Sequence, residues 1–309
     1  MRKTRVTIAA LIAAAALALG ACASDGDGGG GQSSDEATES TDTGGGAEET
    51  PTDDAAGGGS ADVLCSDGGT VKIGIKFDQP GLGFQEGSDY TGFDVDVARY
   101  IADQLGCGDI EFISSPSAQR ENMLQTGQVD MIVATYSITD ARKEVVDFAG
   151  PYFVAGQDLL VAADDDSING PDDLTGKNLC SVTGSTSAER VKSDFNTEVN
   201  LVEQPGYADC LTFLGGNVDA VTTDDIILAG LAATPANKGK FRVVGNPFSE
   251  ENYGVGLPKG STATCEAINE AITSMIDSGE WEKAVSSNTD GTGYTPNADL
   301  NPPTPAACS

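Results

Sequence analysis

Residues 71–75 read Val-Lys-Ile-Gly-Ile, a short apolar run that predicts a buried strand. A helix is predicted over 93–105, where apolar residues recur every three or four positions, and a second strand over 110–113. A strand, a helix and a strand in this order favour a crossover unit, in which a helix covers two parallel strands of one sheet. This stretch therefore indicates an α/β fold.

The alternation of strands and helices continues to residue 278. Further helices are predicted over 120–126, 187–195, 209–214 and 264–278. Further strands are predicted over 131–134, 158–162, 178–182, 200–203, 220–222 and 253–257. This pattern favours two lobes, each a sheet with helices. In open α/β sheets a ligand lies beyond the carboxyl ends of the strands, so polar residues that follow those strands are candidates for its contacts.

The charge of the chain excludes several classes of function. Its 309 residues include 48 Asp and Glu, 17 Lys and Arg, and no His, for a formal net charge of −31. Nucleic acids and anionic bilayer surfaces are bound by Lys and Arg, so neither is expected as a partner. Without His the chain has no Ser-His-Asp triad, no Cys-His dyad and no imidazole ligand for a metal. Neither a metal nor another cofactor is expected.

The first 21 residues have the pattern of a secretory signal. Basic residues precede an apolar run over 8–19, which is too short to cross a membrane, and small residues follow. The sequence Leu19-Gly20-Ala21-Cys22 resembles the lipobox of bacterial lipoproteins, in which the cysteine is lipidated and becomes the N-terminus. The resemblance implies that Cys22 anchors the protein to the outer face of the cell membrane. The alternative is an ordinary signal peptide that ends near a cysteine.

Residues 22–62 are predicted to form a disordered tether that starts at Cys22. From Ala23 to Ala61 the chain has no Val, Ile, Leu, Met, Phe, Trp or Tyr, and Gly, Ser, Thr, Asp and Glu dominate. Such a composition cannot bury enough apolar surface to offset the entropy of folding. As a flexible coil this segment spans about 35 Å, so it holds a folded body, expected over 63–309, away from the membrane.

Six cysteines lie in the predicted folded body. An even number in an exported chain indicates three disulfides, although six cysteines allow 15 pairings. Pairing between sequence neighbours is the simplest hypothesis: Cys65 with Cys107, Cys180 with Cys210, and Cys265 with Cys308. The first pair is supported by the crossover unit, which brings both cysteines to one edge of a sheet. Metal-binding thiolates are the alternative, but no CxxC spacing occurs.

From about residue 71 to 285 the chain resembles the bacterial periplasmic-type solute-binding proteins of ABC transporters for polar amino acids (family 3 type), in particular the glutamate-binding lipoproteins of Gram-positive bacteria. The segments that carry the resemblance are Gly92-Phe93-Asp94-Val95-Asp96-Val97, Gly127-Gln128-Val129-Asp130-Met131-Ile132, Ser137-Ile138-Thr139-Asp140-Ala141-Arg142-Lys143, Val146-Asp147-Phe148-Ala149-Gly150-Pro151-Tyr152 and Val218-Asp219-Ala220-Val221. Each segment is a weak signal alone. Their order and spacing together are specific.

The resemblance implies a two-lobed fold of type II with two hinge strands and a ligand in the cleft between the lobes. The crossings would lie near 152–156 and 250–254. Lobe 1 then comprises residues 63–153 and 253–309, and lobe 2 comprises residues 154–252. The lobes of such receptors close on the ligand by a hinge motion, and the permease and ATPase subunits of the transporter recognise the closed form. A monomeric receptor without enzymatic activity is expected.

The resemblance also implies which residues contact an amino acid ligand. Arg142 matches the arginine that binds the α-carboxylate, because a guanidinium offers two parallel N–H donors. Asp224 matches the carboxylate that binds the α-ammonium group, with Asp225 beside it as the other choice. The remaining matching positions, which offer hydroxyl groups or backbone N–H groups at a helix N-terminus, are Thr135, Ser137, Gly184 and Thr186.

Three residues decide the expected substrate. Lys76, Ser117 and Arg120 resemble the residues that glutamate- and aspartate-binding members use, and they would form charge-assisted hydrogen bonds with a second carboxylate. A site for glutamine would not need these charges. The alternative is that Arg120 pairs with Glu121 or a neighbouring carboxylate on a solvated helix face. Phe77 and Tyr136 are further candidates for the wall of the pocket.

Two other classes of function remain open. Some proteins of this fold are cyclohexadienyl dehydratases, which need a general acid against the leaving hydroxyl of their substrate. Nothing in the sequence marks such a group. A sensory or adhesive lipoprotein that uses the same cleft is a further alternative. L-glutamate, or a related amino acid, is the expected ligand.

Overall fold

The computed structural model describes residues 63–194 and 198–308. The predicted signal peptide, the lipidated Cys22 and the predicted tether over 22–62 lie outside the described residues. The described part contains two five-stranded sheets and one small three-stranded sheet. The predicted α/β class is therefore confirmed, and each of the two large sheets forms the core of one lobe.

The sheet of lobe 1 has the strand order β5-β1-β6-β13-β7. Its strands are β1 (Thr70–Ile75), β5 (Asp109–Ser114), β6 (Met131–Ile132), β7 (Val146–Ala155) and β13 (Glu251–Pro258). Strand β1 pairs in parallel with both β5 and β6, as the predicted crossover requires. Strand β13 returns late in the chain and pairs antiparallel with β6 and β7. Lobe 1 is thus built from two separate parts of the sequence.

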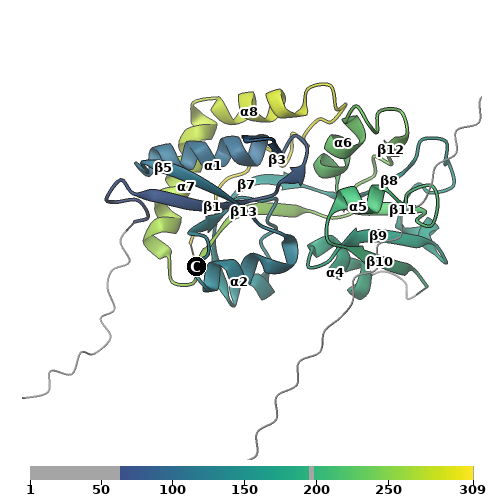
Figure 1. Ribbon diagram of the computed structural model, residues 1–309, viewed down its shortest axis with the longest axis horizontal. Helices are drawn as coiled ribbons and strands as arrows, with labels where there is room; N and C mark the ends of the chain where they lie inside the picture. Colours follow the sequence, from purple (N-terminus) through teal and green to yellow (C-terminus); the bar gives the residue numbers. More distant parts are fainter. Residues whose placement is uncertain (1–62, 195–197, 309) are drawn as a thin grey trace, which may run out of the picture. The chain divides into compact units, whose positions relative to one another are not determined.

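Five helices belong to lobe 1. They are α1 (Phe93–Gln104), α2 (Arg120–Gln125, preceded by the 3₁₀ turn Ser117–Gln119), α3 (Asp140–Lys143), α7 (Thr262–Asp277) and α8 (Glu280–Thr289). Figure 1 shows α1, α7 and α8 beside the strands of this sheet. Phe93 of α1, Phe153 of β7 and Trp281 of α8 are buried and form edge and stacked ring contacts with centroids 5.5–6.1 Å apart. Aromatic packing thus attaches both helices to the sheet.

The sheet of lobe 2 has the strand order β10-β9-β11-β8-β12. Its strands are β8 (Gln157–Ala162), β9 (Asn178–Val182), β10 (Asn200–Gln204), β11 (Ala220–Asp224) and β12 (Phe241–Val243). Its helices are α4 (Thr186–Ser193), α5 (Tyr207–Leu211), α6 (Asp225–Ala233) and the 3₁₀ turn Pro171–Leu174. Strands β9, β10 and β11 run parallel to one another, so their carboxyl ends meet at one edge, where α4, α5 and α6 begin.

The chain passes between the two sheets twice. It goes from β7 through Gly156 to β8, and it returns after β12 to β13. The first passage, at Gly156, is at the end of the predicted crossing over 152–156, and the second, over 244–250, ends where the predicted crossing over 250–254 begins. The small sheet comprises β2 (Asp78–Gln79), β3 (Gly83–Glu86) and β4 (Asp89–Thr91). The residue boundaries of the two lobes stay a prediction.

Several elements differ from the sequence prediction. Strand β6 ends at Ile132, two residues early, because the chain leaves the sheet and reaches a left-handed conformation at Thr135 (φ 47°). Helix α5 covers 207–211 rather than 209–214. The sequence analysis did not place α6, α8 or the small sheet. Helix α6 is apolar on nearly all sides and buried, so it lacks the periodic pattern that marks an amphipathic helix.

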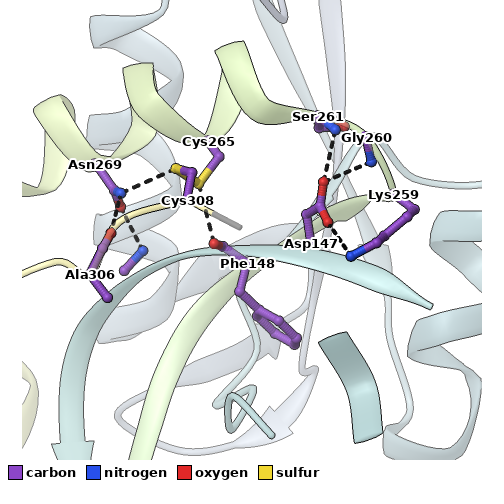
Figure 2. Close-up of a disulfide and its surroundings, with 10 residues drawn as sticks. Asp147, Phe148, Lys259, Gly260, Ser261, Cys265, Asn269, Ala306 and Cys308 are labelled. Atoms are coloured by element: carbon purple, nitrogen blue, oxygen red, sulfur yellow. Dashed lines mark hydrogen bonds and ion pairs between the residues drawn. A yellow bond between two sulfur atoms is a disulfide. The ribbon is translucent and has the colours of Figure 1, made fainter. Parts of the chain in front are cut away.

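The described cysteines form three disulfides. They join Cys65 to Cys107, Cys180 to Cys210, and Cys265 to Cys308, which are the pairs of sequence neighbours. The first links the segment before β1 to the end of α1, as the crossover argument proposed. The third links helix α7 to the C-terminal end of the chain (Figure 2). Each lobe therefore has at least one covalent link of its own.

Candidate functional site

A small cavity lies where polar side chains of lobe 1 meet the carboxyl ends of the strands of lobe 2. The room left within it is about 10 Å³, roughly one water molecule. The residues that line it are Gln79, Ser117, Arg120, Thr135, Arg142, Ser185, Thr186, Ser187, Tyr207, Thr223, Asp224 and Ile227. Six of these were predicted as ligand contacts: Ser117, Arg120, Thr135, Arg142, Thr186 and Asp224.

Arg142 lies in the single-turn helix α3. Thr139 caps this turn, because its hydroxyl accepts a hydrogen bond from the Arg142 backbone N–H at 3.2 Å. The guanidinium pairs through Nε with Glu121 Oε1 at 3.1 Å and donates to the carbonyl oxygens of Ser137 (2.8 Å) and Gly184 (3.1 Å). These bonds use three of its five N–H groups. Because Gly184 belongs to lobe 2, Arg142 joins the two lobes.

Arg120 opens helix α2 and is only 3% exposed. Its hydrogen bonds go to the Ser117 hydroxyl (3.0 Å) and the Thr135 carbonyl oxygen (3.4 Å), which are both neutral. Its Nε is buried without a partner. The alternative pairing with Glu121 does not occur, since Glu121 pairs with Arg142. Burial, followed by the nearby Arg142 charge, lowers the pKa of Arg120.

The ring of Tyr136 lies between the two arginines. Each guanidinium carbon is 4.9 Å from the ring centroid, a distance at which a cation is attracted to an aromatic face. The Tyr136 hydroxyl donates to Glu121 Oε1 at 2.9 Å, so the carboxylate that pairs with Arg142 also holds the ring. The Tyr136 ring therefore stabilises both guanidinium groups, although Tyr136 does not line the cavity.

Asp224 ends strand β11 and faces the arginines from lobe 2. It is 3% exposed, and its Oδ2 accepts a hydrogen bond from Tyr253 of the hinge strand β13 at 2.5 Å. Its Oδ1 is buried and has no partner. Burial, followed by the negative charge of Glu251, raises the pKa of Asp224 well above its usual range. A cation at Oδ1 would therefore stabilise the ionised carboxylate.

Thr135, which accepts a hydrogen bond from Arg120, is held in place by the buried Asp94. The Thr135 backbone N–H donates to Asp94 Oδ2 at 2.8 Å, and the Tyr152 hydroxyl donates to Oδ1 at 2.8 Å. The Thr135 hydroxyl lies 3.2 Å from Gln79 Oε1. Burial raises the pKa of Asp94 to about 6, although these hydrogen bonds oppose the shift. Asp94 therefore stabilises the left-handed backbone of Thr135, from which the Thr135 carbonyl reaches Arg120.

Ser137 and Thr186 face each other across the lobes. Their hydroxyl oxygens are 3.2 Å apart, and Ser137 also pairs as an isolated bridge with Tyr253. Thr186 is the first residue of α4, whose N-cap Ser185 accepts a hydrogen bond from Ala188 N–H at 3.0 Å. Gly184 contributes its carbonyl oxygen to Arg142 rather than an N–H to the cavity. The predicted residues of both lobes thus meet at this point.

Four predicted contact residues do not line the cavity: Ser137, Gly184, Lys76 and Asp225. Lys76 is buried beside it, in a neighbouring cavity of about 250 Å³, and lies 3.6 Å from Asp78. Burial lowers the pKa of Lys76 to about 8, with Arg120 as a further cause. Asp225 directs Oδ1 at the backbone N–H groups of Ile226 (2.7 Å) and Gly156 (3.3 Å). Of the two neighbouring aspartates, only Asp224 therefore faces the cavity.

Six lining residues were missing from the predicted set. They are Gln79, Ser185, Ser187, Tyr207, Thr223 and Ile227. Ser185 and Ser187 flank the predicted Thr186 in the segment that opens α4, so the position of that helix N-terminus could have indicated them. Gln79 lies in a two-residue strand, and Tyr207 lies at the start of a short helix, and neither has a pattern that separates it from a core residue.

The described residues were also searched for membrane-spanning helices and for clusters of metal-binding side chains. Among the described residues, no helix combines the length and the apolar character that a membrane span requires. The same residues contain no cluster of three or more Asp, Glu, Cys and His side chains that could hold a metal ion.

The chain was compared with protein families and with named relatives. Residues 71–288 match the family of bacterial extracellular solute-binding proteins, family 3. Over 236 residues the chain is 44% identical to the glutamate-binding protein GluB of Corynebacterium efficiens and 46% identical to GluB of Corynebacterium glutamicum, covering 72% of this chain and 79% of each relative. The glutamine-binding protein GlnH of Bacillus subtilis is 36% identical over 70% of this chain and 80% of its own.

Solved structures of similar fold were also found. An ancestral arginine-binding protein bound to glutamine is 34% identical, with a TM-score of 0.65 over 71% of this chain and 96% of that protein. The ancestral amino acid-binding protein AncCDT-1, described as a precursor of cyclohexadienyl dehydratase, is 28% identical, with a TM-score of 0.65 over 72% of this chain and 96% of its own. These similarities confirm the predicted two-lobed fold.

Proposed function

Because this chain belongs to the bacterial extracellular solute-binding proteins of family 3 and is an amino-acid-binding receptor, we propose that it captures L-glutamate, or L-aspartate at the same site. The two GluB relatives support this choice through their names and their identity of 44–46%. GlnH and the ancestral structure bound to glutamine support the alternative of an amide ligand. The charges of the cavity favour the acid.

The observation that carries this proposal is the environment of Arg120. Its guanidinium is 3% exposed, its hydrogen bonds go to neutral oxygens, and its Nε has no partner. A buried cation is costly unless an anion pairs with it. Arg142, by contrast, already has Glu121. A ligand with a second carboxylate would supply the missing partner of Arg120, whereas the neutral amide of glutamine would not.

The other ligand groups follow from the charges around the cavity. Arg142 would bind the α-carboxylate with its two remaining N–H groups, and Asp224 would bind the α-ammonium group through Oδ1, which has no partner. Thr135, Ser137, Gly184 and Thr186 would contribute hydroxyl or backbone groups, as the resemblance implies. Lys76 would act at longer range, by adding positive charge beside Arg120. Two carboxylates and one ammonium group would then each meet an opposite charge.

Entry of the ligand requires the lobes to separate. A free space of about 10 Å³ is far smaller than an amino acid. Arg142 and Gly184, Ser137 and Thr186, and Tyr253 and Asp224 are the pairs that join the two lobes around it. We therefore expect a hinge motion at the two crossings, with capture on closure. This motion would expose the arginines of lobe 1 before the carboxylate of lobe 2 reaches the ligand.

The role in transport follows from the family. We propose that the closed receptor delivers its amino acid to an ABC permease, and through it engages the ATPase subunits. A lipid on Cys22 and the tether over 22–62 would keep a monomeric receptor at the outer face of the cell membrane. A change of Cys22→Ser, followed by separation of membrane and culture medium, tests this anchor. Release of the full chain into the medium is expected.

Titration calorimetry with L-glutamate, L-aspartate, L-glutamine and L-asparagine tests the proposed ligand. One molecule of glutamate per chain is expected, with a Kd in the micromolar range or below and with the acids bound at least about tenfold more tightly than their amides. Preference for either amide would contradict the assignment. The ratio of glutamate to aspartate affinity depends on about one methylene of pocket depth, worth about 1–3 kcal/mol.

A specific observation favours a second candidate. Asp224 is a buried carboxyl with a strongly raised pKa in the cavity, and such a group can act as a general acid. A dehydratase acting on a cyclohexadienyl acid would need a group of this kind, and AncCDT-1 is similar in fold. Incubation of the protein with prephenate or arogenate decides between the two, because steady loss of the compound would favour the enzyme and stoichiometric binding of unchanged amino acid the receptor.

A further inference from the structure

The C-terminal segment after helix α8, residues 290–308, lies beyond the family match, which ends at residue 288. It has no helix or strand, yet side-chain contacts hold it along its length. Together with α8 and the end of α7 it lines an open cavity of about 660 Å³, to which Trp281 contributes. The family match therefore does not cover this segment, and its role is inferred from its contacts.

Its far end is fixed to lobe 1. Cys308 forms a disulfide with Cys265 of helix α7, and the Ala306 backbone N–H donates to the carbonyl oxygen of Gly150 at 2.8 Å. Asn269 of α7 donates to the Ala306 carbonyl at 2.8 Å and accepts from Gly150 N–H at 2.7 Å. Figure 2 shows Asn269, Ala306 and the disulfide side by side. Helix α7, the segment and strand β7 are thus joined at one place.

The middle of the segment is hydrogen-bonded to strand β7 at the hinge. Asn301 accepts a hydrogen bond from Val154 N–H at 3.0 Å and donates to the Val154 carbonyl at 2.8 Å. Val154 is one residue before the end of β7, next to the passage through Gly156 into lobe 2. The Asn301 side-chain amide therefore pairs with the backbone N–H and C=O of Val154, as a neighbouring strand would.

Its near end reaches lobe 2. The Tyr294 hydroxyl donates to Oδ1 of Asp225 at 3.3 Å. Asp225 is the first residue of α6, directly after the cavity residue Asp224, and the same oxygen accepts from Gly156 at the hinge. Tyr294 is half-buried, and burial together with the Asp225 charge raises its pKa. One contact thus connects a segment fixed to lobe 1 with Asp225 of lobe 2, the residue that follows Asp224.

We propose that residues 290–308 are a disulfide-anchored strap across the hinge, in which Tyr294 and Asn301 are positioning residues that hold the two lobes around the captured amino acid. The inference rests on the proposed function. The strap makes no contact with the ligand cavity, so its residues act through Asp225 and Val154. The contact between Tyr294 and Asp225 exists only when lobe 2 is close to the strap, and Asn301 fixes the strap to strand β7 at the hinge. Together they therefore slow the opening of the lobes and the release of the ligand.

The test uses Tyr294→Phe and Asn301→Ala in the full chain, with stopped-flow measurement of L-glutamate release. Each change removes hydrogen bonds and leaves the cavity residues intact. The release rate is expected to rise about three- to tenfold, which is the effect of one net hydrogen bond, with a smaller change in the association rate. The matched control is Tyr100→Phe, which removes a hydroxyl bonded to Ser274 Oγ at 3.0 Å in lobe 1, away from the hinge. Its release rate should equal that of the unchanged protein.

The anchor is tested by a double-mutant cycle. Replacement of Cys265 and Cys308 by Ser should raise the release rate, and Tyr294→Phe should then add little, because an unanchored strap no longer joins the lobes. Replacement of Cys65 and Cys107 by Ser is the control: it is expected to lower the melting temperature without a change in release. If the Tyr294 effect is as large without the disulfide as with it, the strap is not anchored in this way.

Hydrogen exchange without any ligand separates this inference from the proposed function. In Tyr294→Phe, the amides of 154–157 and 225–226 should exchange faster, while those of α1 and α7 keep their rates. Should glutamate fail to bind the unchanged protein, the proposed ligand is wrong, and the exchange rates alone decide the role of the strap. Unchanged exchange at the hinge overturns the strap, as does a rise in release that Tyr100→Phe reproduces.

Discussion

The two walls of the candidate cavity carry opposite charge. Lobe 1 contributes Arg120 and Arg142 from two short helices, whereas lobe 2 contributes Asp224 from the end of a strand. Arg120 is held by neighbours of its own lobe, and Arg142 is held by Glu121 and Ser137 of lobe 1 and by Gly184 of lobe 2. Asp224 is held by Tyr253 of the hinge. Under the proposed function, a zwitterion would match the charges of these two walls in one orientation only. The net charge of −31 does not reveal this arrangement, because it sums the charges of the whole chain, whereas a small ligand responds to the charges that line the cavity.

Loss of Arg142 should have the largest effect on the affinity for amino acids. Arg142→Ala removes the proposed partner of every α-carboxylate and the bonds to Ser137 and Gly184, and it leaves Glu121 without its cation. Affinity for all amino acids is expected to fall at least about 1,000-fold, or about 4 kcal/mol, in titration calorimetry. Lys143→Ala removes the adjacent positive charge and should leave binding within about twofold. Retained glutamate binding in Arg142→Ala would show that another group holds the α-carboxylate.

Loss of the opposite charge should have the next largest effect. Asp224→Asn keeps the shape of the side chain but removes the proposed partner of the α-ammonium group, so the Kd for L-glutamate should rise about 100-fold. The Kd for 2-hydroxyglutarate, which lacks the ammonium group, should change little. Asp225→Asn should cost less than tenfold, because that carboxylate faces Gly156 and Tyr294. Equal losses in the two variants would contradict the assignment of Asp224, rather than Asp225, as the partner of the α-ammonium group.

Loss of Arg120 should lower the affinity for acidic amino acids more than the affinity for their amides. In Arg120→Ala the affinity for glutamate should fall about 10- to 100-fold and the affinity for glutamine less than about threefold, because only the acid has a second carboxylate. The same calorimetric titrations measure both ratios. Arg99→Ala, which removes an exposed guanidinium of lobe 1, is the matched control. Equal losses for acid and amide would mean that Arg120 has a structural role.

A pH effect is expected on stability rather than on ligand affinity. The pKa of Asp94 is raised by burial to about 6 in the folded protein, against 3.8 in the unfolded chain. Between these values the folded state holds the proton more tightly, so the stability contributed by this group falls as pH rises from about 4 to 6, by about 3 kcal/mol at most. Urea unfolding at several pH values should show a weaker slope of this sign in Asp94→Asn. Asp103→Asn, at an exposed position, should keep the slope of the unchanged protein.

Sequence patterns predicted most of the sheet scaffold but less of the site. Strand β9 has the predicted bounds and strand β1 begins one residue before the predicted start, because short apolar runs between turns mark buried strands well. The candidate contacts Arg142 and Asp224 followed from resemblance, since nothing local distinguishes them from a helix arginine or a helix cap. Gln79 and Tyr207 line the same cavity without any such signal. They reach it only because distant segments fold against each other.

The sequence by itself determined the class of fold, the pairing hypothesis for the cysteines and the residue types of the candidate site. Local spacing and composition carry that information, because apolar periodicity and turn residues act over a few positions. The tertiary structure alone decided that Arg120 lacks a carboxylate partner, that Asp224 rather than Asp225 faces the cavity, and that residues 290–308 cross the hinge. Each of these depends on contacts between residues far apart in the chain, and burial then sets the energy of the charges that meet there.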